Sequence, residues 1–169
     1  MKRILSFTYW AILFFYLFLL IDTVFIGRHD FRSVNLIPFD SINNFIMVDN
    51  GFGKIRIIDM NVWGNILMFI PAGIYLILHN SSKSIAKNLI SIFMLSVFIE
   101  VVQYVFALGA TDVDDIILNL IGGFIGLMMY KIAEKIFKDN LKIKKAISIL
   151  SLIVGLPIFV IYVLLIIAN

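Results

Sequence analysis

The sequence predicts an all-α membrane protein, a polytopic bundle of about five transmembrane helices with a cytoplasmic N-terminus and an extracytoplasmic C-terminus. The first indication is composition: of 169 residues, 62% are hydrophobic and 15% charged, whereas soluble proteins average about 45–50% apolar and about 25% charged residues. The second is a series of long apolar runs, because a helix needs about 20 mainly apolar residues to cross the hydrocarbon core. The third is the uneven distribution of lysine and arginine among the connections, which sets orientation.

The first predicted helix covers residues 4–26 and follows the basic N-terminus Met1-Lys2-Arg3. Its apolar run is longer than the core of a signal peptide, about 7–15 residues, and no small-x-small cleavage site follows it. We therefore expect this segment to stay attached as a transmembrane helix.

The connection that follows, residues 27–61, is the one substantial external loop. It mixes charged residues with aromatic and aliphatic residues such as Phe31, Phe39 and Phe45. A disordered linker is poorer in aromatic residues. We expect a cap that lies on the membrane surface or partly re-enters it.

The second and third helices, predicted at residues 62–79 and 88–108, carry polar residues toward their outer ends. Asn65 lies a few residues into the first of them, and Glu100 and Gln103 lie on the second with Ser96 at helical spacing. A carboxylate near the centre of a transmembrane helix disfavours insertion by about 2.5–3.5 kcal/mol. Glu100 therefore needs a partner, a proton or water.

The fourth helix, predicted at residues 114–133, begins in the acidic stretch ATDVDDIILNLIGGFIG. Positions 112, 115, 119, 122 and 126 step by three and four and so share one helix face, which reads Asp, Asp, Asn, Gly, Gly. Gly122 and Gly126 form a GxxxG pattern, which is typical of closely packed helices. The acids have two interpretations: they cap the helix N-terminus, which we favour for Asp114, or they form a polar site with Glu100.

The fifth helix is predicted at residues 146–167, after a lysine-rich segment, 134–145, that we expect to be a cytoplasmic loop. Ten of the fourteen lysines and arginines lie in the N-terminus, near residues 83–87 and in 131–145, and such residues are retained in the cytoplasm. The outer cap holds the other four: Arg28, Arg32, Lys54 and Arg56. The predicted organisation is a membrane domain, 1–133, the basic loop, 134–145, and an additional transmembrane helix, 146–169.

The polar positions together predict an outward-facing site between the helices. The candidate catalytic residues are Glu100 and Asp115, as acid and base; the candidate ligand-binding residues are Arg32, Asn35, Asn65, Gln103, Asp112 and Asn119. We predict no metal site and no cofactor, because His29 and His79 fall on opposite sides of the membrane and no spacing demands an ion at the carboxylates. No nucleic-acid partner is predicted, since topology accounts for the net charge of +3.

Four ordered motifs resemble the VanZ-like family of small bacterial membrane proteins: RSVNLIPF, GNILMFIPAGIYL, IEVVQ and DVDDIILNLIGGFIG. The resemblance covers roughly residues 8–133 and leaves out the lysine-rich segment and the last helix. It implies these signature positions: Arg32, Asn35, Pro38, Asn65, Pro71, Glu100, Gln103, Asp112, Asp115 and Asn119. The family pattern often has an arginine shortly before the first acid of the fourth helix, where this chain has LGAT.

The resemblance implies a multi-pass protein of the bacterial cell membrane and a link to resistance against the lipoglycopeptide teicoplanin, without an established biochemical activity. Two mechanisms stay open. In one, the polar site and the basic cap bind an amphiphile, such as a lipoglycopeptide or a lipid-linked cell-wall precursor. In the other, a membrane enzyme modifies such a precursor with Glu100 and Asp115. A transporter is less favoured, because it would need polar residues through both leaflets, and the inner halves of the helices are apolar. The oligomeric state is not predicted.

Overall fold

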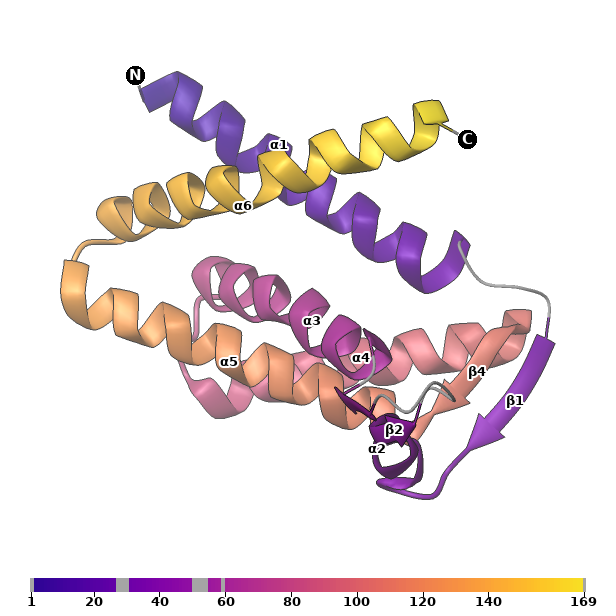
Figure 1. Ribbon diagram of the computed structural model, residues 1–169. Helices are drawn as coiled ribbons and strands as arrows, with labels where there is room; N and C mark the ends of the chain where they lie inside the picture. Colours follow the sequence, from indigo (N-terminus) through magenta and orange to yellow (C-terminus); the bar gives the residue numbers. More distant parts are fainter. Residues whose placement is uncertain (1, 27–30, 50–54, 59, 169) are drawn as a thin grey trace. The chain divides into compact units, whose positions relative to one another are not determined.

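Five long helices dominate the computed structural model, which describes residues 2–26, 31–49, 55–58 and 60–168 (Figure 1). The five are α1 (Lys2–Ile21), α3 (Met60–His79), α4 (Ile85–Phe106), α5 (Val113–Phe137) and α6 (Asn140–Ala168). All five are long and apolar enough to cross a membrane. The predicted all-α membrane bundle is confirmed, and the chain is a multi-pass membrane protein.

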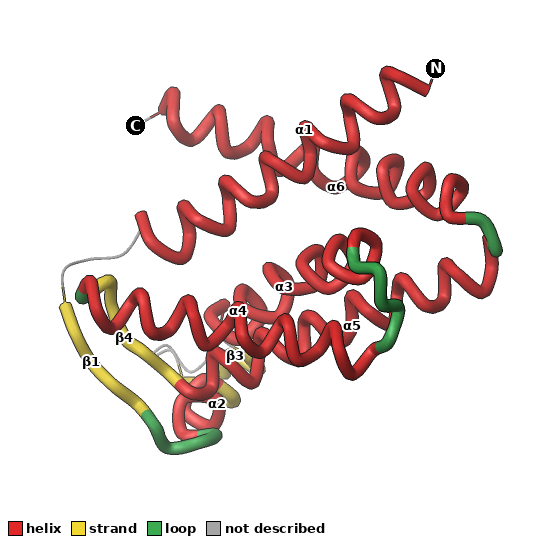
Figure 2. The backbone as a smooth tube through the Cα atoms, turned by 180° about the vertical axis from the view of Figure 1, so that it is seen from behind, coloured by secondary structure: helices red, strands yellow, loops and turns green. Residues whose placement is uncertain are grey.

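The remaining elements lie in or beside the predicted cap, and several of them are strands (Figure 2). They are the π-helical turn η1 (Asp22–Ile26), β1 (Phe31–Asn35), the short helix α2 (Asp40–Phe45), β2 (Ile46–Asp49), β3 (Ile55–Ile58) and β4 (Leu108–Asp112). Strand β1 pairs in parallel with β4, with Arg32 opposite Gly109 and Asn35 opposite Asp112. Strands β2 and β3 form an antiparallel pair. The cap is therefore joined by main-chain hydrogen bonds to the segment just before α5.

Helix α4, the third of the predicted helices, ends at Phe106 and not at the predicted residue 108, because the chain turns there. Ala107 adopts a left-handed conformation with φ of 57°, and its N–H is directed at the carbonyls of Gln103 and Tyr104. Gly109 follows with φ of 106°, which a side chain rarely tolerates. These two residues turn the chain into β4.

The described structure divides into two compact units. The central unit is Thr23–Lys131. The terminal unit combines Met1–Asp22 with Ile132–Asn169.

Within the central unit, α3 and α5 pack backbone against backbone through glycines. A Cβ atom placed on Gly73, Gly122 or Gly126 would lie under 3.0 Å from a backbone carbonyl oxygen of the facing helix. The GxxxG pattern thus has the packing role that the sequence predicted, since only glycine allows this approach. The close contact fixes α5 against α3 and thereby places the acids at the start of α5.

At the other end of α3, Lys83 caps the helix. Its Nζ donates to the carbonyls of Ile77 at 2.6 Å, Leu78 at 3.0 Å and Asn80 at 3.0 Å. The last carbonyls of a helix lack intrahelical donors, so this lysine satisfies them.

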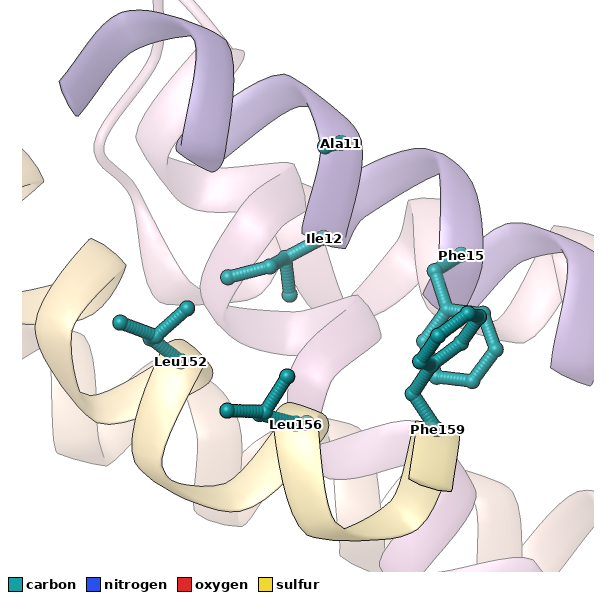
Figure 3. A pocket seen from close by; sticks show the side chains of 7 residues that line it. Ala11, Ile12, Phe15, Leu152, Leu156 and Phe159 are labelled. Carbon is teal, nitrogen blue, oxygen red and sulfur yellow. The ribbon is translucent and has the colours of Figure 1, made fainter. Parts of the chain in front are cut away.

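In the terminal unit, α1 and α6 pack side by side and run in the same direction. Phe15 contacts Phe159 with ring centroids 5.0 Å apart, and Phe18 contacts Tyr162 at 5.8 Å. Ile12 and Leu156 line a small apolar cavity between the two helices (Figure 3). Parallel helices that both span a membrane place their outer ends on the same side. With five crossings, the first and the last helix must run through the membrane in the same direction, as α1 and α6 do. The side of the membrane on which the N-terminus lies stays a prediction.

The lysine-rich segment expected as a loop at 134–145 is mostly helical. Helix α5 extends to Phe137 and α6 begins at Asn140, which leaves Lys138 and Asp139 as the turn. Lysine, glutamate and alanine are good helix formers, so charge alone does not mark a loop. A left-handed residue at Lys138, with φ of 51°, ends α5.

Candidate functional site

The polar face of α4 is buried in the central unit, as its spacing predicted. Ser96, Glu100 and Gln103 are all buried, with Glu100 only 4% exposed. The Glu100 Oε2 atom accepts a hydrogen bond from the backbone N–H of Asp112 at 3.0 Å. The intramembrane carboxylate therefore holds the corner between β4 and α5.

The Asp112 side chain reaches the cap. Its carboxylate accepts hydrogen bonds from Asn35 Nδ2, at 3.3 and 3.4 Å to its two oxygens, and from the hydroxyl of Ser41. Asn35 Nδ2 also donates to Ser41 Oγ at 2.9 Å. The register of β1 and β4, which sets Asn35 opposite Asp112, brings these side chains together.

The carboxylate of Asp114, predicted to cap the N-terminus of its own helix, contacts the cap segment instead. The residue is fully buried, and its carboxylate accepts the backbone N–H groups of Phe39 at 2.5 Å and Ile42 at 3.0 Å. Phe39 has a left-handed backbone with φ of 67°, so its N–H points away from the regular helical path. Asp114 thus caps the start of α2, a different helix from its own. It lies off the 112/115/119 stripe, and no local signal marks the contact across 75 residues of sequence.

The other two polar residues of the stripe, Asp115 and Asn119, connect α5 to different helices. Asp115 Oδ1 accepts a hydrogen bond from Asn65 Nδ2 on α3 at 2.5 Å. Asn119 Nδ2 donates to Ser96 Oγ on α4 at 2.9 Å. Ser96 is one turn from Glu100, and both Asn119 and Glu100 are buried. Both side chains are therefore inside the central unit, as the sequence predicted, and away from its lipid-facing surface.

Gln103 is directed toward the first segment of the central unit. Its Nε2 donates to the carbonyl of Val24, in η1, at 3.1 Å. Among the described residues, no donor reaches Gln103 Oε1 or Asn119 Oδ1, and both atoms are buried. Two acceptors thus remain available to a small donor inside the unit, of which water is the simplest.

Arg32 lies at the edge of this network and is exposed. Its Nη2 donates to the carbonyl of Val105 at 3.2 Å, and its guanidinium lies over the Tyr104 ring, 5.0 Å from the centroid. Exposed apolar side chains are present on the same cap and on the end of α4: Val34, Leu36, Ile37, Phe39, Val105 and Phe106. The structure therefore sets a cation beside an apolar surface.

Arg28 and Lys54 lie outside the described residues, and Arg56 lies on β3, opposite Val48. No group of three or more His, Asp or Glu residues in the described ranges is arranged to hold a metal ion.

The part of the chain that is similar to known proteins is nearly the same part that holds the four motifs. Residues 6–134, well over half of the chain, match the family model described as VanZ/LLP1. Protein VanZ of Enterococcus faecium is 34% identical over 105 residues, which cover 62% of this chain and 56% of that protein. The chain thus spans little more than half the length of this curated relative. No solved structure matches the chain.

Proposed function

This chain belongs to the VanZ/LLP1 family, as its four motifs predicted, and we propose that it binds an amphiphilic ligand of the bacterial cell envelope at the outer surface of the cell membrane. Through such binding it would contribute to resistance against lipoglycopeptides such as teicoplanin. The ligand class is an anionic head joined to an apolar chain, which includes lipid-linked cell-wall precursors.

The observation that carries this proposal is the position of Arg32. Its guanidinium is exposed and is held by the Val105 carbonyl and the Tyr104 ring. The apolar side chains of Val34 and Leu36, on the same cap, are exposed as well. A guanidinium binds phosphate or carboxylate through two parallel hydrogen bonds. An amphiphile could place its anionic head on Arg32 and its chain along Val34 and Leu36.

Two acids at the start of α5, the partly buried Asp112 and the fully buried Asp114, support the same proposal by holding the cap in place. Asp112 accepts hydrogen bonds from Asn35 and Ser41, and Asp114 accepts two from the start of α2. Both groups of contacts immobilise the segment that follows Arg32. Ordering the binding surface before the ligand arrives lowers the entropic cost of binding.

Substitution of Arg32 tests the proposal directly. We expect Arg32→Gln to weaken binding about 10- to 100-fold, because a hydrogen bond to a charged group contributes about 1.5–3 kcal/mol. Arg32→Lys should fall between, since lysine keeps the charge without the paired donors. Binding of purified full-length protein to teicoplanin, lipid II and undecaprenyl phosphate would be measured by native mass spectrometry.

The thermal stability of both Arg32 variants should match the wild type, because the side chain is exposed. Lys87→Gln, which removes an exposed lysine at the start of α4, serves as the control for a general loss of charge. Equal binding of every ligand by wild type and Arg32→Gln would refute the proposed site.

Glu100→Gln separates binding from the alternative, in which Glu100 and Asp115 act as acid and base on a lipid-linked precursor. Glutamine keeps an acceptor oxygen for the Asp112 N–H, so the binding proposal expects ligand binding and teicoplanin resistance to persist in this variant. Acid–base catalysis would be lost with the carboxyl group. Conversion of a radiolabelled envelope lipid by the wild type, absent in a variant that still binds it, would favour the enzyme.

A further inference from the structure

The turn between α5 and α6 exposes a dense group of lysines. We name it the lysine turn; it comprises Lys135, Lys138, Lys142, Lys144 and Lys145, all exposed. The segment lies wholly within the terminal unit. Its two acids are Glu134 and Asp139, and the Asp139 carboxylate accepts the backbone N–H of Leu141 at 2.9 Å. Positive charge therefore predominates on this surface.

The backbone of the lysine turn has a defined conformation. The N–H of Lys138 donates to the Glu134 carbonyl at 3.0 Å, and the N–H of Ile143 donates to the Asp139 carbonyl at 3.0 Å. Ile143 is almost fully buried, which directs its neighbours on the helix, Lys142 and Lys144, toward the surface. The cations are thus presented from a short, capped connection.

Three of these lysines are at an unfavourable position for the helix itself. Lys142, Lys144 and Lys145 lie in the first two turns of α6, which has no acidic residue in its first turn. The N-terminal end of a helix carries partial positive charge and favours anions over cations. Retention of positive charge in the cytoplasm explains why lysines occur in this connection. The Asp139 carboxylate at the start of α6 offsets part of this repulsion, and a bound anion would offset more.

Apolar side chains alternate with the lysines on the same surface. Ile136 is 66% exposed and Leu141 is 72% exposed, although both lie next to charged residues. Because α5 and α6 both have the length and composition of membrane spans, their connection lies at a membrane interface. Apolar side chains there contact acyl chains, while the long lysine side chains reach the headgroups.

We propose that the lysine turn binds the anionic headgroups of phospholipids, such as phosphatidylglycerol, in the leaflet where α5 and α6 meet. This binding is independent of the ligand proposed for Arg32, which belongs to the central unit. One lysine near an anionic membrane surface raises affinity about fivefold, so each lysine of the turn should contribute a measurable part.

The test uses the full-length protein in nanodiscs of equal parts phosphatidylcholine and phosphatidylglycerol, with retained lipids counted by native mass spectrometry. The wild type should retain phosphatidylglycerol in excess. Lys142→Gln and Lys144→Gln should each reduce that excess by up to about fivefold, whereas the corresponding arginine variants should keep it. Lys87→Gln, which removes an exposed lysine outside the turn, should reduce the excess less than either turn variant, because Lys87 is not part of a cluster of exposed lysines.

Inorganic phosphate added at the same concentration as the anionic lipid should not displace it, because phosphate lacks the acyl chains that Ile136 and Leu141 would contact. Single substitutions leave four lysines to retain the orientation, and a C-terminal reporter checks this in each variant. An undiminished excess in both glutamine variants would overturn the proposal. Equal loss in Lys87→Gln, loss in the arginine variants, or displacement by phosphate would also overturn it.

Discussion

Gly126→Ala is expected to destabilise the central unit by about 1–3 kcal/mol, the usual range for overpacking a close contact. A Cβ at this position would lie under 3.0 Å from the Ile70 carbonyl oxygen, which is backbone and cannot move aside as a side chain would. Helices α3 and α5 would have to separate. The measurement is the free energy of unfolding in mixed detergent micelles, together with the fraction of protein that stays monodisperse on heating.

The matched control is Gly64→Ala on α3. A Cβ there meets nothing within 4 Å, and alanine favours a helix interior over glycine by about 1 kcal/mol. The same substitution should therefore change the free energy of unfolding differently at the two positions. We expect no loss or a small gain of stability at Gly64, and a clear loss at Gly126. Equal effects would mean that α3 and α5 do not touch at Gly126.

Asp114→Asn is expected to release the cap from the start of α5. The carboxylate accepts two backbone N–H groups, from Phe39 and Ile42, in a fully buried position. An amide keeps one acceptor oxygen and turns an NH₂ group toward the other donor. A buried donor without an acceptor costs about 1–3 kcal/mol. We expect a loss of stability in that range and faster hydrogen exchange at the amides of Phe39 and Ile42.

Asp139→Asn provides the comparison for this variant. Asp139 also accepts a backbone N–H at the start of a helix, that of Leu141, but it is exposed. Water can replace its contribution, so the effect should be a few tenths of a kcal/mol, in line with most surface substitutions. Unchanged exchange at Phe39 and Ile42 in the Asp114 variant would contradict the role assigned to Asp114.

The contacts of Asp114 also connect the stability of the cap with the proposed ligand binding. If Asp114 holds the segment after Arg32, then Asp114→Asn should weaken ligand binding even though Asp114 lies beneath the surface. Arg32→Gln should weaken binding without loss of stability. The pair of variants therefore separates residues that position the cap from the residue proposed to contact the ligand.

Much of the membrane architecture follows from local sequence. Apolar run length determines a spanning helix almost by itself, because the bilayer thickness is fixed and every backbone group must be satisfied within the helix. The same holds for the GxxxG pattern at Gly122 and Gly126, where only one residue type permits close backbone approach. The 3.6-residue period likewise placed Glu100, Gln103 and Asn119 on buried faces.

The cap could not be predicted in the same way. Its composition indicated a segment folded near the membrane, but β1 pairs with β4 across more than 70 residues of sequence. Such a pairing depends on where α4 ends and on the left-handed backbone at Ala107 and Gly109, and neither strand has a distinctive apolar alternation. The lysine-rich segment was predicted as a loop from its charge alone, whereas the structure makes it mostly helical, as the helix propensity of lysine, glutamate and alanine favours.

By itself the sequence determined that the chain lies in a membrane, how many helices span it, and which polar side chains must be buried away from lipid. These features depend on transfer free energies summed along short stretches of chain. Only the tertiary structure decided the partners of the polar residues: Glu100 with the Asp112 backbone, Asp114 with the cap, and Arg32 with Tyr104. A hydrogen bond or a stacked ring depends on distance and direction between elements that are remote in sequence. Those quantities are set when the helices and the cap pack together.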